Sequence, residues 1–114
     1  MNDYAQMEED LRIEEEQAKE LIKYRDALMR LQQNKDFKLI MSEGYFKNEA
    51  SRLVLLRADP SIQEDPKIVR SIDDKIIAVG ELRQYFITTL ARGHQAEESL
   101  KEAREAFKDM ENGE

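Results

Sequence analysis

Residues 66–110 read PKIVRSIDDKIIAVGELRQYFITTLARGHQAEESLKEAREAFKDM, and the spacing of their apolar residues decides the fold. Apolar or small residues recur every three or four positions, which places them along one face of a helix. The series is Val79, Leu82, Phe86, Thr89, Gly93, Ala96, Leu100, Ala103, Phe107 and Met110. A stripe this narrow is typical of a seam between two helices. We therefore predict one long helix over about 66–110 that continues through Gly93.

Two more helices are predicted upstream of this one. A weaker stripe indicates a helix over about residues 3–33, and it consists of Tyr4, Met7, Leu11, Ala18 and Leu21. A second helix, over about 36–58, carries apolar residues on two nearly opposite sides, with Phe37 on one side and Phe46 on the other. A helix that is apolar on both sides is typical of the middle layer of a bundle.

The connector over residues 59–65 is the one clear break in the chain. Its Asp59-Pro60 pair and the following Asp65-Pro66 pair each place a capping Asp before a Pro that suits the first position of a helix. The fold class is therefore predicted to be all-α. We expect a single domain over residues 1–114, in which the helices over 36–58 and 66–110 form an antiparallel hairpin, a third long helix packs beside it, and the arms resemble coiled coils.

Two glycines suggest a register for this hairpin. If the hairpin turns about Ile62, residues whose numbers add up to about 124 lie at the same height, and Gly44 and Gly80 satisfy this condition. Glycines at one level let two helix backbones approach closely. We therefore predict a helix crossing at Gly44 and Gly80.

The composition limits the class of protein. Charged residues make up 38% of the 114 residues, more than the quarter or so of an average domain, and cysteine is absent. The N-terminus is acidic and has no apolar core, so we expect no secretory signal. No apolar run approaches the roughly 20 residues that span a bilayer, so we expect no transmembrane segment. The expected location is the cytoplasm of a host cell or a virion.

The sequence offers no recognisable catalytic or metal-binding set. It contains no glycine-rich phosphate loop. His94 is the only histidine, and with Glu98 one turn later it would supply two metal ligands where zinc sites usually have three or four. Neighbouring acidic residues on a helix diverge and do not converge on a substrate. We therefore expect no enzyme activity, no catalytic residues, no metal and no cofactor.

Charge is unevenly spread, because acidic arms flank a basic middle. We expect the arms to contact a protein partner, self-association included, through Glu8, Glu9, Asp10, Glu14, Glu15, Glu16, Leu100, Ala103 and Phe107. Membrane binding is not expected. The helix over 36–58 has a basic face with interleaved aromatics, which leaves nucleic-acid binding as a third hypothesis. Its residues are Lys35, Lys38, Lys47, Arg52 and Arg57, with Tyr45 and Phe46 among them.

Three segments resemble small helical proteins encoded near the head and portal genes of tailed bacteriophages. They are EGYFKNEA (Glu43 to Ala50), RLVLLRADP (Arg52 to Pro60) and LRQYF (Leu82 to Phe86), within a resemblance that covers about residues 36–92. The resemblance implies a virion-associated or assembly role. The leading hypothesis is thus a non-enzymatic helical assembly or interaction protein, and the alternative is a small acidic regulator that binds and inhibits a host nucleic-acid enzyme.

Overall fold

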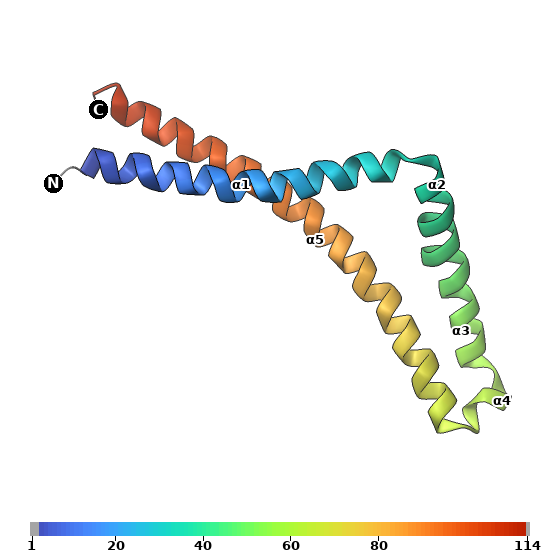
Figure 1. The fold of residues 1–114 in the computed structure, drawn as a ribbon. Coiled ribbons are helices and arrows are strands. Elements are labelled where there is room, and N and C mark those ends of the chain that lie inside the picture. The colour runs from blue at the N-terminus through green and yellow to red at the C-terminus, as the bar shows by residue number, and fades with distance from the viewer. Residues whose placement is uncertain (1–2, 114) are drawn as a thin grey trace. The chain divides into compact units, whose positions relative to one another are not determined.

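The computed structural model describes residues 3–113 and is all-α, as the sequence predicts. None of these described residues lies in a strand. Met1, Asn2 and Glu114, which the expected domain includes, lie outside the described range. The elements are α1 (Asp3–Gln33), α2 (Lys35–Phe37), the π-helix η1 (Lys38–Glu49), α3 (Ala50–Ala58), α4 (Pro60–Gln63) and α5 (Pro66–Glu111) (Figure 1).

Short polar side chains cap the N-termini of the helices that follow each break in the chain. The Asn34 side chain accepts a hydrogen bond from the Phe37 backbone N–H at 2.9 Å. Asp59 accepts from the N–H and the hydroxyl of Ser61, and these bonds hold the pKa of the Asp59 carboxyl below its usual range. Asp65 accepts from the Lys67 N–H at 3.0 Å. These bonds satisfy N–H groups that the first turn of a helix leaves without partners.

Contacts divide the chain into two compact units, which are described separately. Unit 1 comprises Met1–Met29 and Thr88–Glu114, and unit 2 comprises Arg30–Ile87. The single domain expected from the sequence stays a prediction.

Unit 1 is an antiparallel pair formed by α1 and the C-terminal part of α5 (Figure 1). Arg25 of α1 pairs with Glu97, and Glu15 pairs with Arg104, so residue numbers fall along α5 as they rise along α1. The buried cluster is Ala18, Ala96 and Leu100, with Ile22 packed against it. Ile22 therefore takes the place in the seam that the sequence assigned to Leu21, which is 39% exposed.

The predicted seam on α5 is confirmed in unit 1 as far as Phe107, but Met110, the last residue of the predicted series, is 46% exposed. Gly93, Ala96 and Leu100 are buried, and Ala103 and Phe107 are half-buried. The two helices approach closely at Gly93, because a Cβ on this residue would lie only 2.1 Å from the Cβ of Arg25. α5 continues as a helix through Gly93. Glycine is thus needed at this position for contact with α1, and its backbone freedom is not used.

Unit 2 contains an antiparallel hairpin in which residues 66–87 of α5 pack against η1 and α3. Its buried cluster is Leu53, Ile72 and Val79, and Leu53 is only 2% exposed. Half-buried residues packed against this cluster are Tyr45, Phe46, Ala50, Leu56, Ile62 and Ile76. Near the turn of the hairpin, the Arg57 guanidinium donates to Asp73 at 2.7 Å.

The π-helix changes which residues share a face in unit 2. Phe37 and Phe46 are nine residues apart, which is two and a half turns of an α-helix at about 3.6 residues per turn, so they were predicted on opposite sides. In the structure both rings contact Phe86, at centroid distances of 6.0 and 5.9 Å. The hydrogen bonds of a π-helix reach five residues back and widen each turn. The wider turns of η1 bring both rings to the same face.

The predicted crossing of Gly44 and Gly80 is wrong. A Cβ on Gly80 would meet nothing within 4 Å, and one on Gly44 would meet the carbonyl oxygen of Leu39 in its own helix at 3.2 Å. The prediction assumed that both arms of the hairpin are straight α-helices in register about Ile62. The π-helix breaks that assumption, because it changes both the rise and the facing of residues 38–49.

Replacing Gly93 by alanine is expected to lower the free energy of unfolding by about 1–3 kcal/mol, because the new methyl group collides with the Cβ of Arg25. Gly80→Ala is the matched control in the same helix. Its methyl group enters open space, so it is expected to stabilise by up to about 1 kcal/mol. Thermal denaturation followed by circular dichroism measures both. A rise in stability for both variants would contradict the close approach at Gly93.

Candidate protein-interaction surfaces

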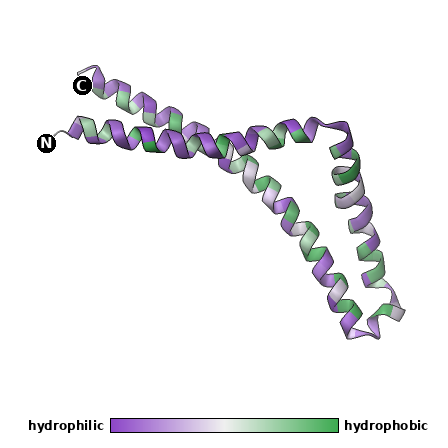
Figure 2. Cartoon of the chain, in the orientation of Figure 1, coloured by the Kyte–Doolittle hydropathy of each residue, from purple (hydrophilic) through white to green (hydrophobic). Residues whose placement is uncertain are grey.

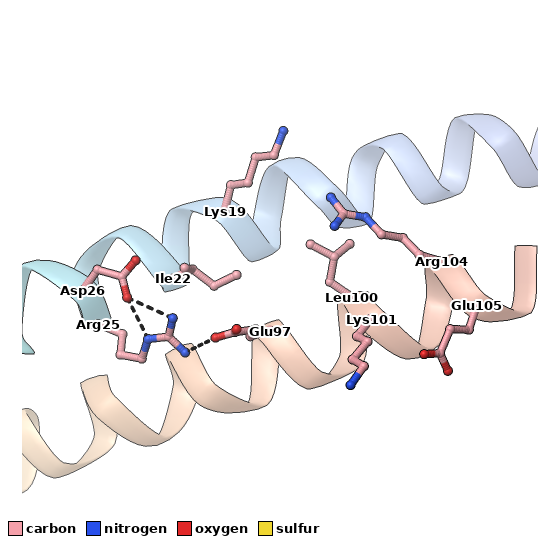
Figure 3. Close-up of a pocket in the computed structure, with 9 residues that line it drawn as sticks. All are labelled: Lys19, Ile22, Arg25, Asp26, Glu97, Leu100, Lys101, Arg104 and Glu105. Carbon is pink, nitrogen blue, oxygen red and sulfur yellow. Dashed lines mark hydrogen bonds and ion pairs between the residues drawn. The ribbon is translucent and has the colours of Figure 1, made fainter. Parts of the chain in front are cut away.

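Arg25 is the buried charged residue of the described part of unit 1, at 8% exposed (Figure 3). Its guanidinium lies between the two helices. It forms ion pairs with Asp26, at 2.9 Å, and with Glu97 across the helix pair. Its Nη1 also lies 3.1 Å from Nδ1 of His94. Because a guanidinium has no acceptor, His94 must accept this hydrogen bond at Nδ1.

These partners fix the charge of Arg25. The hydrogen bonds that Arg25 donates to Glu97 and then to Asp26 raise the pKa of Arg25, so the guanidinium stays protonated. The aliphatic part of the side chain lies over Gly93 while the charged end reaches the two carboxylates. Arg25 therefore packs as an apolar residue along its stem and pairs as a cation at its tip.

Several grooves run along the helix pair of unit 1, and two of them differ in charge. The mixed groove has a volume of about 600 Å³, and opposite charges alternate along it (Figure 3). It is lined by Lys19, Ile22, Arg25, Asp26, Glu97, Leu100, Lys101, Arg104 and Glu105. Four basic and three acidic residues line it, so this groove offers little net charge to a partner.

The acidic groove has a volume of about 510 Å³ and a floor of small residues. It is lined by Glu14, Gln17, Ala18, Leu21, Ala96, Ser99, Leu100, Glu102 and Ala103. Glu14 and Glu102 are the only charged residues in this lining, and neither has a hydrogen bond or ion pair within residues 3–113.

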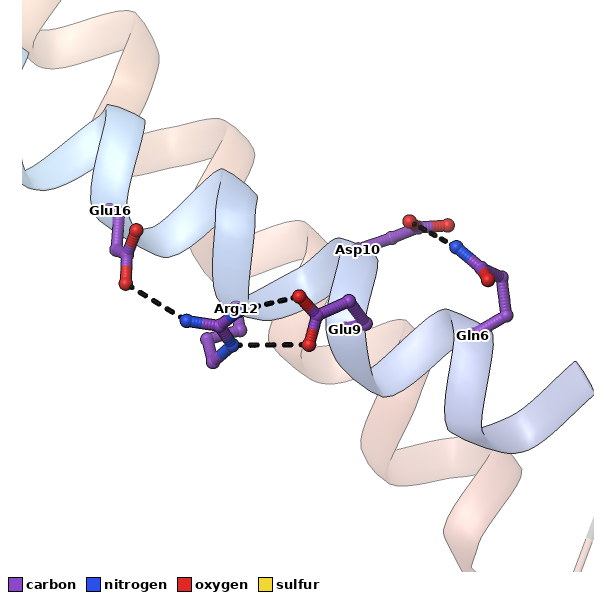
Figure 4. Close-up of polar contacts among 5 residues, drawn as sticks. All are labelled: Gln6, Glu9, Asp10, Arg12 and Glu16. Carbon is purple, nitrogen blue, oxygen red and sulfur yellow. Dashed lines mark hydrogen bonds and ion pairs between the residues drawn. The ribbon is translucent and has the colours of Figure 1, made fainter.

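Most acidic residues predicted as partner contacts lie exposed on α1, but several are already paired (Figure 4). Arg12 bridges Glu9 and Glu16, and the Gln6 side chain donates to Asp10 at 3.0 Å. Arg104 donates to the half-buried Glu15 at 3.1 Å. Among the predicted acids, Glu8 and Glu14 have neither kind of contact with the described residues.

The three apolar residues predicted to contact a partner belong instead to the seam inside unit 1. Leu100 is 6% exposed and forms part of the buried cluster. Phe107 is half-buried, with its ring 5.3 Å from that of Tyr4. Ala103 is half-buried as well, although it also lines the acidic groove. α1 packs over this stripe, so a partner could contact only those parts of it that line a groove, such as the parts of Leu100 and Ala103 in the acidic groove.

The basic face predicted on residues 36–58 is also partly occupied. Arg52 pairs with Glu49, and Arg57 pairs with Asp73. Tyr45 and Phe46 are half-buried against the core of unit 2. These aromatic rings therefore pack within the hairpin and are not displayed for stacking on bases.

Unit 2 leaves large apolar side chains in solvent on both arms of its hairpin. Figure 2 shows apolar residues recurring along η1, α3 and the adjoining part of α5. The side chains more than half exposed are Leu39, Ile40, Val54, Leu55, Ile77 and Tyr85, and Leu55 reaches 73%. Single exposed apolar residues are common, but several within one small unit are typical of a protein-binding surface.

Within residues 3–113, no three side chains of His, Asp and Glu are grouped to hold a metal ion. None of the helices in this range is both long enough and apolar enough to cross a membrane. His94 is solvent-exposed, and its contact with Arg25 was not predicted from the sequence.

Comparison with protein-family models, curated proteins and solved structures found no match to the chain. The resemblance of residues 36–92 to phage proteins therefore stays a prediction.

Sequence reasoning missed the Arg25 cluster, although one signal was present. Arg25 interrupts the apolar stripe of α1 at a seam position, and Gly93 occupies a seam position on α5. A long side chain can pack in such a seam when the residue opposite it is a glycine, because the glycine leaves space for the stem. The acidic groove had no sequence signal, because it depends on which residues of the two helices lie opposite each other.

Arg12 lowers the pKa of Glu9, first through its hydrogen bond and then through its charge. The pair therefore contributes stability at pH values above the pKa of a free glutamate, and this contribution is lost as pH falls through the lowered pKa of Glu9. Arg12→Gln is expected to raise the pKa of Glu9, and an NMR titration of its carboxyl carbon measures it. Lys19→Gln is the control. An unchanged pKa of Glu9 in Arg12→Gln would contradict the pairing.

Two substitutions separate the packing of Arg25 from its charge. Arg25→Met keeps an unbranched apolar stem over Gly93 and is expected to retain most of the melting temperature. Arg25→Ala removes the stem and is expected to lower the melting temperature clearly more. If both variants melted at the same reduced temperature, the ion pairs and not the stem would be the main contribution of Arg25.

Proposed function

We propose that this chain is a non-enzymatic helical protein that acts by binding other proteins, as one component of a larger assembly. The observation that carries the proposal is the exposed apolar surface of unit 2. Leu55 on α3 and Ile77 on α5 are 73% and 56% exposed, although each belongs to a hairpin with its own buried cluster. Covering such side chains with a partner removes apolar area from water, which favours association.

The folded units support this reading in a second way. Unit 1 covers its own seam, so the narrow apolar stripes at the two ends of the chain do not themselves require a second copy. Unit 1 also exposes some large apolar residues, but apart from Tyr24 the ones that are more than half exposed lie in the hairpin of unit 2. A phage particle or its assembly is the setting we propose, on the resemblance of residues 36–92 alone.

The alternative, an acidic regulator of a nucleic-acid enzyme, has its own support. Unit 1 contains sixteen acidic and eight basic residues, whereas unit 2 contains nine and ten. The net charge of −7 of the whole chain therefore originates in unit 1. An acidic helix pair suits a basic surface, and nucleic-acid enzymes carry such surfaces.

The test captures partners with the tagged full chain from its native source and quantifies them by mass spectrometry. Leu55→Glu and Ile77→Glu are expected to reduce partner recovery strongly while changing the free energy of unfolding by about 0.5 kcal/mol or less, since both sites are exposed. Ser51→Glu, at an exposed polar site on α3, is the control and should retain the partners. Undiminished recovery with both apolar variants would refute a docking role for unit 2.

A further inference from the structure

We propose that the acidic groove of unit 1 binds an amphipathic helix of a partner protein whose apolar stripe is flanked by lysine or arginine. The inference rests on the proposed interaction function and adds a second contact surface with a defined chemistry. It uses the groove between α1 and α5 that is lined by Ala18, Ala96 and Ala103 with Glu14 and Glu102.

The shape of this groove suits a third helix. Ala18, Ala96 and Ser99 are small, so the surface between the two helices is hollow and not filled by long side chains. A helix packs by placing the ridge of its side chains into such a hollow. Leu21, at 39% exposed, lines the groove, and Tyr24, at 56% exposed, follows three residues later on the same side of α1. They extend the apolar contact by one turn.

Charge selects which helix fits. Glu14 and Glu102 are the only charged residues lining the groove, and both carboxylates lack a hydrogen bond or ion pair within the described chain. The mixed groove differs, because it is lined by four bases and three acids. An apolar floor between unpaired carboxylates favours lysine or arginine at the edges of the incoming stripe. The excess of acids in unit 1 adds attraction at longer range.

A second copy of this chain is a poorer occupant. Its most basic helical stretch is η1 with α3, and two bases of that stretch, Arg52 and Arg57, are already paired with Glu49 and Asp73. Phe46 of the same stretch packs into the core of unit 2. Two bases and one aromatic ring of the stretch are therefore already engaged, so a foreign helix with unpaired lysine or arginine fits the groove better.

The test uses a fluorescent helical peptide with leucines at i, i+3 and i+7 and lysines beside them, and measures its binding to the full chain by anisotropy. The Glu14→Lys/Glu102→Lys variant is expected to bind about tenfold more weakly or worse than the parent chain. Glu8→Lys/Glu20→Lys makes the same change in net charge outside the groove and is expected to lose clearly less. Binding should weaken as salt rises, and a peptide with glutamates in place of lysines should not bind.

Three results would overturn the inference. The first is no binding of the lysine peptide, and the second is an equal loss in the two charge-reversed variants, which would show general attraction only. The third is self-association of the parent chain in sedimentation equilibrium that Glu14→Lys/Glu102→Lys abolishes, because the occupant would then be a second copy. None of these three results would affect partner capture that depends on Leu55 and Ile77. Failure of the acidic groove to bind a helix is therefore distinguishable from failure of the proposed function.

Discussion

Gly93 has no side chain where α5 meets Arg25 of α1, and this close contact sets how the two helices of unit 1 pair. Any larger residue would push the backbones apart, and the small seam residues Ala18 and Ala96 would lose contact. Arg25 also ties the pair to one register, because its cation reaches Glu97 only when its stem lies over the glycine. A buried polar residue that specifies register has the same role in coiled coils.

Both units have small cores, and different interactions hold the helices together in each. Unit 1 uses close backbone approach and charge pairing, with only a few buried side chains. Unit 2 uses larger side chains around Leu53, Ile72 and Val79, together with a group of aromatic rings. The first arrangement leaves a charged exterior and the second leaves an apolar one. Two helices alone have too little surface to cover each other on all sides, so each arrangement leaves a face that a partner can use.

The parts of the fold that depend on local chemistry were readable from the sequence. Asp59-Pro60 and Asp65-Pro66 mark the residues at which α4 and α5 begin. The seam from Val79 to Phe107 was readable too, because a repeat of three and four residues is a property of one helix. Contacts between helices were not, since Gly80 and Gly93 look alike in sequence and only Gly93 lies against another helix. The acidic groove was missed for the same reason.

The π-helix η1 has a consequence for how this chain can change during evolution. A helix with wider turns holds more residues over the same rise, so losing or gaining one residue there exchanges one hydrogen-bond pattern for another without breaking the helix. α5 has no such tolerance, because one inserted residue rotates every later seam position by about 100°. Among descendants of this chain, single-residue length changes should therefore collect in residues 38–49, while α5 should lengthen or shorten by whole heptads.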